Sequence, residues 1–101
     1  MRLHESAKAV ADSEHIATTM FSTRAGILFL HELQKTYDSI ALTPTIGSII
    51  EELAGTRHAG VRQCTVKRFR NYIVFYRIGR DEIVIERILD GRRNYLPLFF
   101  S

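Results

Sequence analysis

The chain has 101 residues, of which 46% are apolar and 25% are charged, an ordinary composition for a folded globular protein. This length supports a single domain, residues 1–101, and the composition excludes extensive disorder. Its single cysteine, Cys64, excludes an internal disulfide, and no segment approaches the roughly 20 apolar residues needed to cross a bilayer. The segment Met1–Ser13 also lacks the apolar stretch of a signal peptide, so we expect a cytoplasmic protein without a membrane partner.

Charge is distributed unevenly between the two halves of the sequence. Residues 1–55 hold four Lys/Arg and seven Asp/Glu, a net charge of −3, whereas residues 56–101 hold ten and four, a net charge of +6. Nine of the ten later cations are arginines, whose planar guanidinium suits carboxylates and phosphates. The second half therefore carries either a solvated rim or a surface for nucleic acid or an acidic protein segment.

The first half of the sequence predicts two helices. Residues 7–19 show a loose helical spacing, with a weak apolar face made of Ala7, Val10, Ala11, Ile16 and Ala17. Ser22 or Thr23 then provides an N-cap, and from Arg24 onward a stronger stripe recurs at three- and four-residue steps, consisting of Ala25, Leu28, Phe29, Leu33, Tyr37 and Ile40.

Two apolar residues of the second helix, Ile27 and Leu30, lie off this stripe. Because a short link makes the two helices antiparallel neighbours, we expect both side chains to pack on the first helix. The second helix should end at Thr43-Pro44, since the residue before a proline avoids helical dihedrals. A short helical turn is then expected over Ser48–Leu53, closed by Gly55.

The second half predicts strands. Residues 61–68 alternate as expected for a strand with one drier face, and Phe69-Arg70-Asn71 should turn the chain. Two β-branched and aromatic runs, Tyr72–Ile78 and Ile83–Leu89, flank a short polar break and predict a hairpin. Met1–Leu3 offers a short edge strand. Together these elements indicate an α+β fold, with an N-terminal helical hairpin packed on an antiparallel sheet.

Few residues are arranged for catalysis or metal binding. None of the histidines, His4, His15, His31 and His58, pairs at helical spacing, so we expect neither a metal nor a cofactor. Cys64 alternates with Val66 and is interpreted as a buried structural thiol. What remains is an arginine-rich rim interleaved with tyrosines. Its aromatic rings either stack on RNA bases or, for Tyr72 and Tyr76, fill the core of the sheet.

Four segments of the chain carry a family resemblance: Ala11–Ile16 (ADSEHI), Leu42–Gly47 (LTPTIG), Asn71–Ile78 (NYIVFYRI) and Ile83–Arg93 (IVIERILDGRR). In this order and at this spacing they resemble the A-D-L-x-x-I, L-x-x-P-x-x-G, N-Y-[LIV]-[IV]-F-Y-R and I-x-R-[VI]-L-H-G-x-R patterns of the RelE/ParE superfamily. This superfamily comprises bacterial toxins of type II toxin–antitoxin systems. The resemblance covers most of the chain and implies a helical hairpin against a small curved antiparallel sheet, held inactive by a cognate antitoxin.

The resemblance also implies a choice between two targets. RelE-like members cut mRNA on the ribosome and commonly carry an arginine directly after the tyrosine that opens the central strand, whereas ParE-like members inhibit DNA gyrase. Here that position is Ile73, and Asp90 stands where many members have histidine. An acid beside the basic tail would oppose phosphate binding, and Lys67 stands alone where nucleases are rich in lysine. The sequence thus favours a ParE-like growth inhibitor that binds gyrase. A RelE-like ribosome-dependent mRNA endoribonuclease is the alternative, and a degenerate toxin kept as an interaction module is a third reading.

The same resemblance assigns roles to particular residues. We expect the target to be bound by Arg70, Arg87, Arg92, Arg93 and Tyr95; in a nuclease, the last three of these would be catalytic. The partners implied are a cognate antitoxin in a hetero-oligomer, gyrase (or the ribosome and mRNA), and operator DNA only indirectly through the antitoxin. The apolar residues Leu98, Phe99 and Phe100 either bind the antitoxin or fold back to complete the core.

Overall fold

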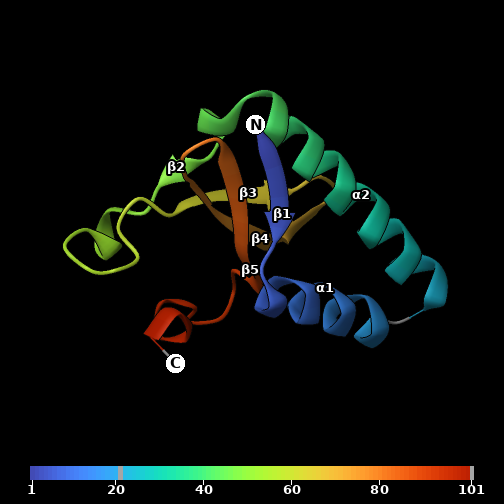
Figure 1. Ribbon diagram of the computed structural model, residues 1–101. Coiled ribbons are helices and arrows are strands. Elements are labelled where there is room, and N and C mark those ends of the chain that lie inside the picture. Colours follow the sequence, from blue (N-terminus) through green and yellow to red (C-terminus); the bar gives the residue numbers. More distant parts are fainter. Residues whose placement is uncertain (21, 101) are drawn as a thin grey trace.

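A computed structural model describes residues 1–20 and 22–100 and has an α+β architecture, as expected (Figure 1). Two helices, α1 (Ala7–Thr19) and α2 (Thr23–Leu42), accompany five strands: β1 (Arg2–Glu5), β2 (Ser48–Ile49), β3 (Arg62–Val66), β4 (Phe69–Ile78) and β5 (Glu82–Asp90). Short 3-10 helices lie at Pro44–Ile46, Glu51–Leu53 and Leu96–Phe100. The strands form one sheet in the order β1-β5-β4-β3-β2.

The sheet is mixed, which corrects the expectation of a purely antiparallel sheet. The predicted edge strand exists but runs from Arg2 to Glu5, and it pairs parallel with β5, from Arg2 opposite Glu82 to Glu5 opposite Ile85. The other neighbouring strands pair antiparallel. A parallel partner for β5 requires a long crossover, which the helical hairpin and the β2–β4 segment supply.

Both helices begin at the serine caps that their sequences provide. The Ser6 hydroxyl accepts a hydrogen bond from the Ala9 amide at 3.0 Å, and the Ser22 hydroxyl accepts one from the Ala25 amide at 3.1 Å. The buried face of α1 differs from the predicted one, since it consists of Ala9, Ser13 and Ile16. A polar residue is tolerated on that face because the Ser13 hydroxyl donates to the Val10 carbonyl at 3.0 Å.

The predicted stripe of α2 is confirmed for Phe29, Leu33, Tyr37 and Ile40, which are all buried. It is wrong for Leu28, which is 40% exposed. Ile27 and Leu30 also remain largely exposed rather than packing on α1. Gly26 instead lies against the backbone of Ala17, and from that contact the two helices diverge (Figure 1).

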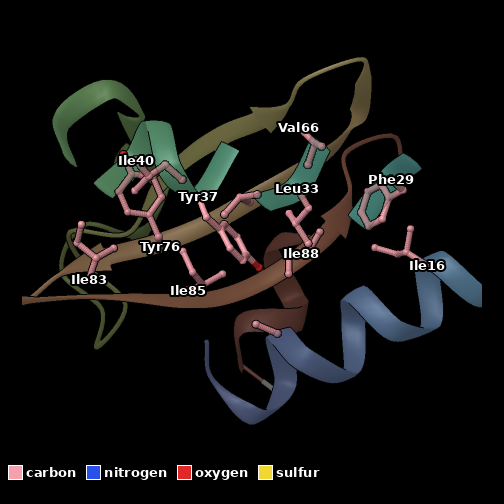
Figure 2. Packing of buried hydrophobic residues seen from close by; sticks show 12 residues of the cluster. Ile16, Phe29, Leu33, Tyr37, Ile40, Val66, Tyr76, Ile83, Ile85 and Ile88 are labelled. Atoms are coloured by element: carbon pink, nitrogen blue, oxygen red, sulfur yellow. The ribbon is translucent and has the colours of Figure 1, made fainter. Parts of the chain in front are cut away.

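The central strand β4 is buried on both faces, which explains its nearly continuous apolar sequence. Towards the helices, Val74 and Tyr76 join the larger cluster of buried side chains, part of which Figure 2 shows between α1, α2 and the sheet. On the opposite face, Phe75 belongs to a second cluster that also contains Ile50, Leu53, Val61, Leu89 and Phe99. The segment before β3 and the C-terminal 3-10 helix cover that face.

Two local predictions are wrong. The turn between β3 and β4 lies at Lys67 and Arg68, where Arg68 has a φ of 66°, and β4 already begins at Phe69. Phe69 is kept in the strand by an edge-to-face contact with Phe29, with ring centroids 5.4 Å apart. Residues 48–53 do not form one helical turn, because Ser48 and Ile49 pair with β3 before the 3-10 helix begins.

Candidate functional site

The sequence segments that carry the family resemblance contact one another in pairs, and the first pair joins the end of α2 to the sheet. The Tyr76 hydroxyl donates to the Pro44 carbonyl at 2.6 Å and accepts from the Gly47 amide at 2.8 Å. A Cβ at Gly47 would lie 2.7 Å from that hydroxyl, so only glycine fits. The Leu42–Gly47 segment and the second tyrosine of β4 therefore form one structural unit.

A second pair joins α1 to β5. Arg87 donates to the two carboxylate oxygens of Asp12 at 2.8 Å (Nε to Oδ2) and 3.0 Å (Nη2 to Oδ1), and the Ile88 amide donates to the same carboxylate at 3.0 Å. Both side chains are largely buried. This pairing raises the pKa of Arg87, because the charged guanidinium is the form that Asp12 hydrogen-bonds.

A third contact closes the turn after β5 over Ile73. The Gly91 amide donates to the Asn71 carbonyl at 2.6 Å, and a Cβ on Gly91 would lie only 2.6 Å from the Ile73 side chain. Ile73 packs against the second cluster beside Tyr95 and Leu96. The position that distinguishes the nuclease branch in the family resemblance is therefore occupied by an apolar, half-buried side chain.

The exposed cations Arg70, Arg92 and Arg93 lie at one end of the β4–β5 ladder, and we call them the C-terminal basic surface. Arg92 is engaged by Asp90, to which its Nε and Nη2 donate at 3.0 and 2.8 Å and its amide at 3.0 Å. The side-chain hydrogen bond from Arg92 lowers the pKa of Asp90, and the nearby charges of Arg92 and Arg93 act in the same direction. A carboxylate thus already occupies part of this basic surface.

Two residues expected at the target-binding surface have other contacts. Arg87 is turned to Asp12 and is largely buried, so its guanidinium is not part of the C-terminal basic surface. Tyr95 is half-buried and stacks at a tilt on Phe75, with ring centroids 5.0 Å apart. Arg92 and Arg93 are exposed, and Arg70 is exposed near them.

Beside the basic surface lies a hollow of about 290 Å³ between α1, the ends of β4 and β5, and the following turn. Its charged and polar lining includes Asp12, His15, Tyr72, Asp90 and Arg93. Tyr72 enters this lining with its ring packed edge-to-face on Phe29 at a centroid distance of 5.4 Å. Sequence periodicity could not indicate this hollow, because it combines residues of α1 with residues that lie 53 to 86 positions later.

The C-terminal apolar residues divide between core and surface. Phe99 is 5% exposed and packs edge-to-face on Phe75 at 5.1 Å, whereas Phe100 is 54% exposed. His58 contacts both phenylalanine rings, at centroid distances of 5.5 and 5.6 Å. Leu98 is half-buried at the edge of the second cluster. Phe99 therefore completes the core, while Phe100 remains available at the surface.

The tyrosines and the cysteine considered as candidate site residues are packed within the fold. Tyr76 is fully buried and Tyr72 packs on Phe29, as the interpretation of core tyrosines expected. Cys64 is half-buried, and burial raises the pKa of its thiol, which disfavours the nucleophilic thiolate. No group of three potential metal ligands occurs within residues 1–20 and 22–100. In the same residues, neither helix has the length and apolarity required to span a membrane.

The helical hairpin packed against a sheet is the architecture that the RelE/ParE resemblance implied, although the sheet is five-stranded and mixed rather than antiparallel. The family described as "ParE toxin of type II toxin-antitoxin system, parDE" matches residues 4–95, and the chain belongs to this family. A solved chain from the chromosomal ParDE TA system of P. aeruginosa has the same fold, with a TM-score of 0.69 at 21% identity, covering 87% of this chain and 92% of that chain. No curated protein sequence matches significantly.

Proposed function

We propose that this protein is the toxin of a ParDE-type pair, that it inhibits growth by binding DNA gyrase, and that a cognate antitoxin neutralises it. The observation that carries this proposal is the family match over residues 4–95, together with an apolar residue at the position that distinguishes the two branches. Ile73 lies beneath Gly91 and offers a substrate no charged group.

The ionisable groups near Ile73 also favour binding over catalysis. RNA cleavage needs a general base and acid beside the attacked hydroxyl, and cations that stabilise the phosphate charge. Arg92 is hydrogen-bonded to Asp90, and Tyr95 packs its ring on Phe75. The roles assigned to Arg92, Arg93 and Tyr95 in a nuclease are therefore less well supported than contacts with a protein target.

The antitoxin is proposed to contact the C-terminal tail through Phe100 and the adjacent Leu98. Phe100 is the most exposed of the three apolar residues Leu98, Phe99 and Phe100, and exposed aromatic side chains are frequent anchors in protein interfaces. Phe99 would contribute indirectly, because it holds the tail on the second cluster. Phe100→Ala should weaken antitoxin binding without lowering thermal stability, whereas Phe99→Ala should lower both. Equal antitoxin affinity for Phe100→Ala and the unmodified protein would exclude this contact.

The gyrase assignment is tested with purified toxin, gyrase and relaxed plasmid. The expected result is loss of supercoiling or accumulation of cleaved plasmid, reversed by addition of the antitoxin. Toeprinting of a translated message in the presence of the toxin is the companion measurement. Unchanged gyrase activity at toxin excess, combined with site-specific cuts in the ribosomal A site, would instead assign the endoribonuclease function.

A further inference from the structure

The hollow between α1 and the turn after β5 contains hydrogen-bond donors that the fold does not use. His15, Tyr72 and Arg93 line it, and none of their side chains makes a hydrogen bond to another group in residues 1–20 or 22–100. By contrast, the carboxylates in the same lining are engaged, since Asp12 accepts from Arg87 and Asp90 accepts from Arg92. The hollow thus offers free donors but no free acceptor carboxylate.

The charges of the hollow and of the adjoining Arg92 leave a single positive charge; Arg70, also in the C-terminal basic surface, does not line the hollow. Three guanidinium groups, those of Arg87, Arg92 and Arg93, stand against the two carboxylates of Asp12 and Asp90. Arg87 and Asp12 neutralise each other in a largely buried pair, and Arg92 is matched by Asp90. The charge on Arg93 is therefore the one left over, at the mouth of a hollow large enough for a side-chain carboxylate.

We propose that this hollow is a binding site for one carboxylate, supplied by an acidic segment of a protein partner. Arg93 is its charged donor, with the Tyr72 hydroxyl and the His15 imidazole as neighbouring donors. The proposal rests on the proposed function only in taking a protein, rather than a nucleic acid, as the partner. The adjacent Arg92–Asp90 pair shows the arrangement that a guanidinium adopts around a carboxylate in this turn.

A nucleic acid fits the same surface less well. It brings one phosphate per nucleotide, whereas the lining of the hollow leaves one positive charge uncompensated, so further phosphates would meet no matching cation there. Single-stranded nucleic acids also require aromatic faces on which bases stack. Here the ring of Tyr72 packs on Phe29 and that of Tyr95 packs on Phe75.

The test is a titration of the full isotope-labelled chain with three probes, in which the chemical shifts of the backbone amides are measured by NMR. The probes are a blocked peptide alternating serine and glutamate, its counterpart with glutamine, and an oligothymidylate of similar length. We expect saturable shifts at His15, Tyr72 and Arg93 with the glutamate peptide only. Absence of saturation, equal response to the glutamine peptide, or tighter binding of the oligothymidylate would overturn the proposal.

Variants separate the hollow from general electrostatic attraction. Arg93→Gln should weaken binding of the glutamate peptide by about fivefold or more, because it removes a charge-assisted donor. Tyr72→Phe should give a smaller loss while keeping the ring on Phe29. The matched control is Arg80→Gln, which removes an exposed arginine in the turn between β4 and β5, at the other end of that ladder. If Arg93→Gln and Arg80→Gln weaken peptide binding equally, the loss of affinity reflects only the change in net charge, and the proposed site is refuted. Because this titration contains no gyrase, its outcome is independent of the gyrase assay.

Discussion

Replacement of Asp12 by alanine should be among the most destabilising single changes at a charged residue of this protein. The carboxylate accepts from Arg87 at 2.8 and 3.0 Å and from the Ile88 amide at 3.0 Å, and it thereby fixes α1 against β5. The side chains of Asp12 and Arg87 are 15% and 17% exposed, so water replaces the lost partner poorly.

The size of the effect follows from what the substitution leaves behind. Breaking a buried ion pair from one side costs about 3–5 kcal/mol, because the remaining charge is uncompensated. Residual exposure of Arg87 reduces this figure, and alanine regains up to about 0.7 kcal/mol of helix propensity in α1. We therefore expect a loss of about 2–4 kcal/mol in the free energy of unfolding. For a chain of this size, that corresponds to a fall in Tm of about 10–25 °C.

The assay is urea and thermal unfolding of the variant beside a matched control, Glu86→Ala. That control removes the carboxylate of another arginine pair, Arg77–Glu86, whose side chains are 39% and 23% exposed. It should cost less than about 1 kcal/mol. Asp12→Ala combined with Arg87→Met should recover part of the stability, because the buried charge is then gone. Equal losses for Asp12→Ala and Glu86→Ala would refute the reasoning.

Two further predictions concern the other contacts between motif segments. Tyr76→Phe leaves the Pro44 carbonyl and the Gly47 amide without their shared hydroxyl, so the free energy of unfolding should fall by about 2–4 kcal/mol. The control Tyr37→Phe loses one hydrogen bond to the exposed Glu5 and should cost about 1 kcal/mol. Equal costs for the two variants would contradict the structural role given to the Tyr76 hydroxyl. The pKa of Asp90 is lowered in the folded state, so the stability that this carboxylate contributes is present above its ordinary pKa of 3.8 and is lost as the pH falls through the lower, folded value. Asp90→Asn should therefore flatten the fall in Tm between about pH 5 and pH 2, and an unchanged acid profile would count against the Arg92–Asp90 contact.

The elements that sequence periodicity could reveal are those with a strong one-sided pattern or a nearly continuous apolar run. The buried stripe of α2 and the β4–β5 hairpin are of this kind, and both are confirmed apart from Leu28 and the start of β4, which lies at Phe69. The weak pattern of α1 misled, because its buried face contains Ser13, whose hydroxyl is satisfied within the helix. The parallel pairing of β1 could not be predicted, since a four-residue edge strand carries no signal of its direction.

The sequence could predict that cations make up the candidate site, but not how they are arranged in space. Arg92 and Arg93 were expected at the surface and lie there, whereas Arg87 forms a largely buried ion pair with Asp12. That pairing spans 75 positions, so only the tertiary structure brings the two residues together. The sequence also did not indicate that His15 lines the hollow, because an isolated histidine on an exposed helical face has no periodic signature.

The most direct test of the account is gyrase supercoiling measured with three forms of the toxin: unmodified, Arg92→Gln/Arg93→Gln, and the Arg80→Gln control. If the C-terminal basic surface binds gyrase, the unmodified toxin and Arg80→Gln will inhibit supercoiling, and the double variant will require a markedly higher concentration. Full gyrase activity at excess of the unmodified, folded toxin would contradict the central claim.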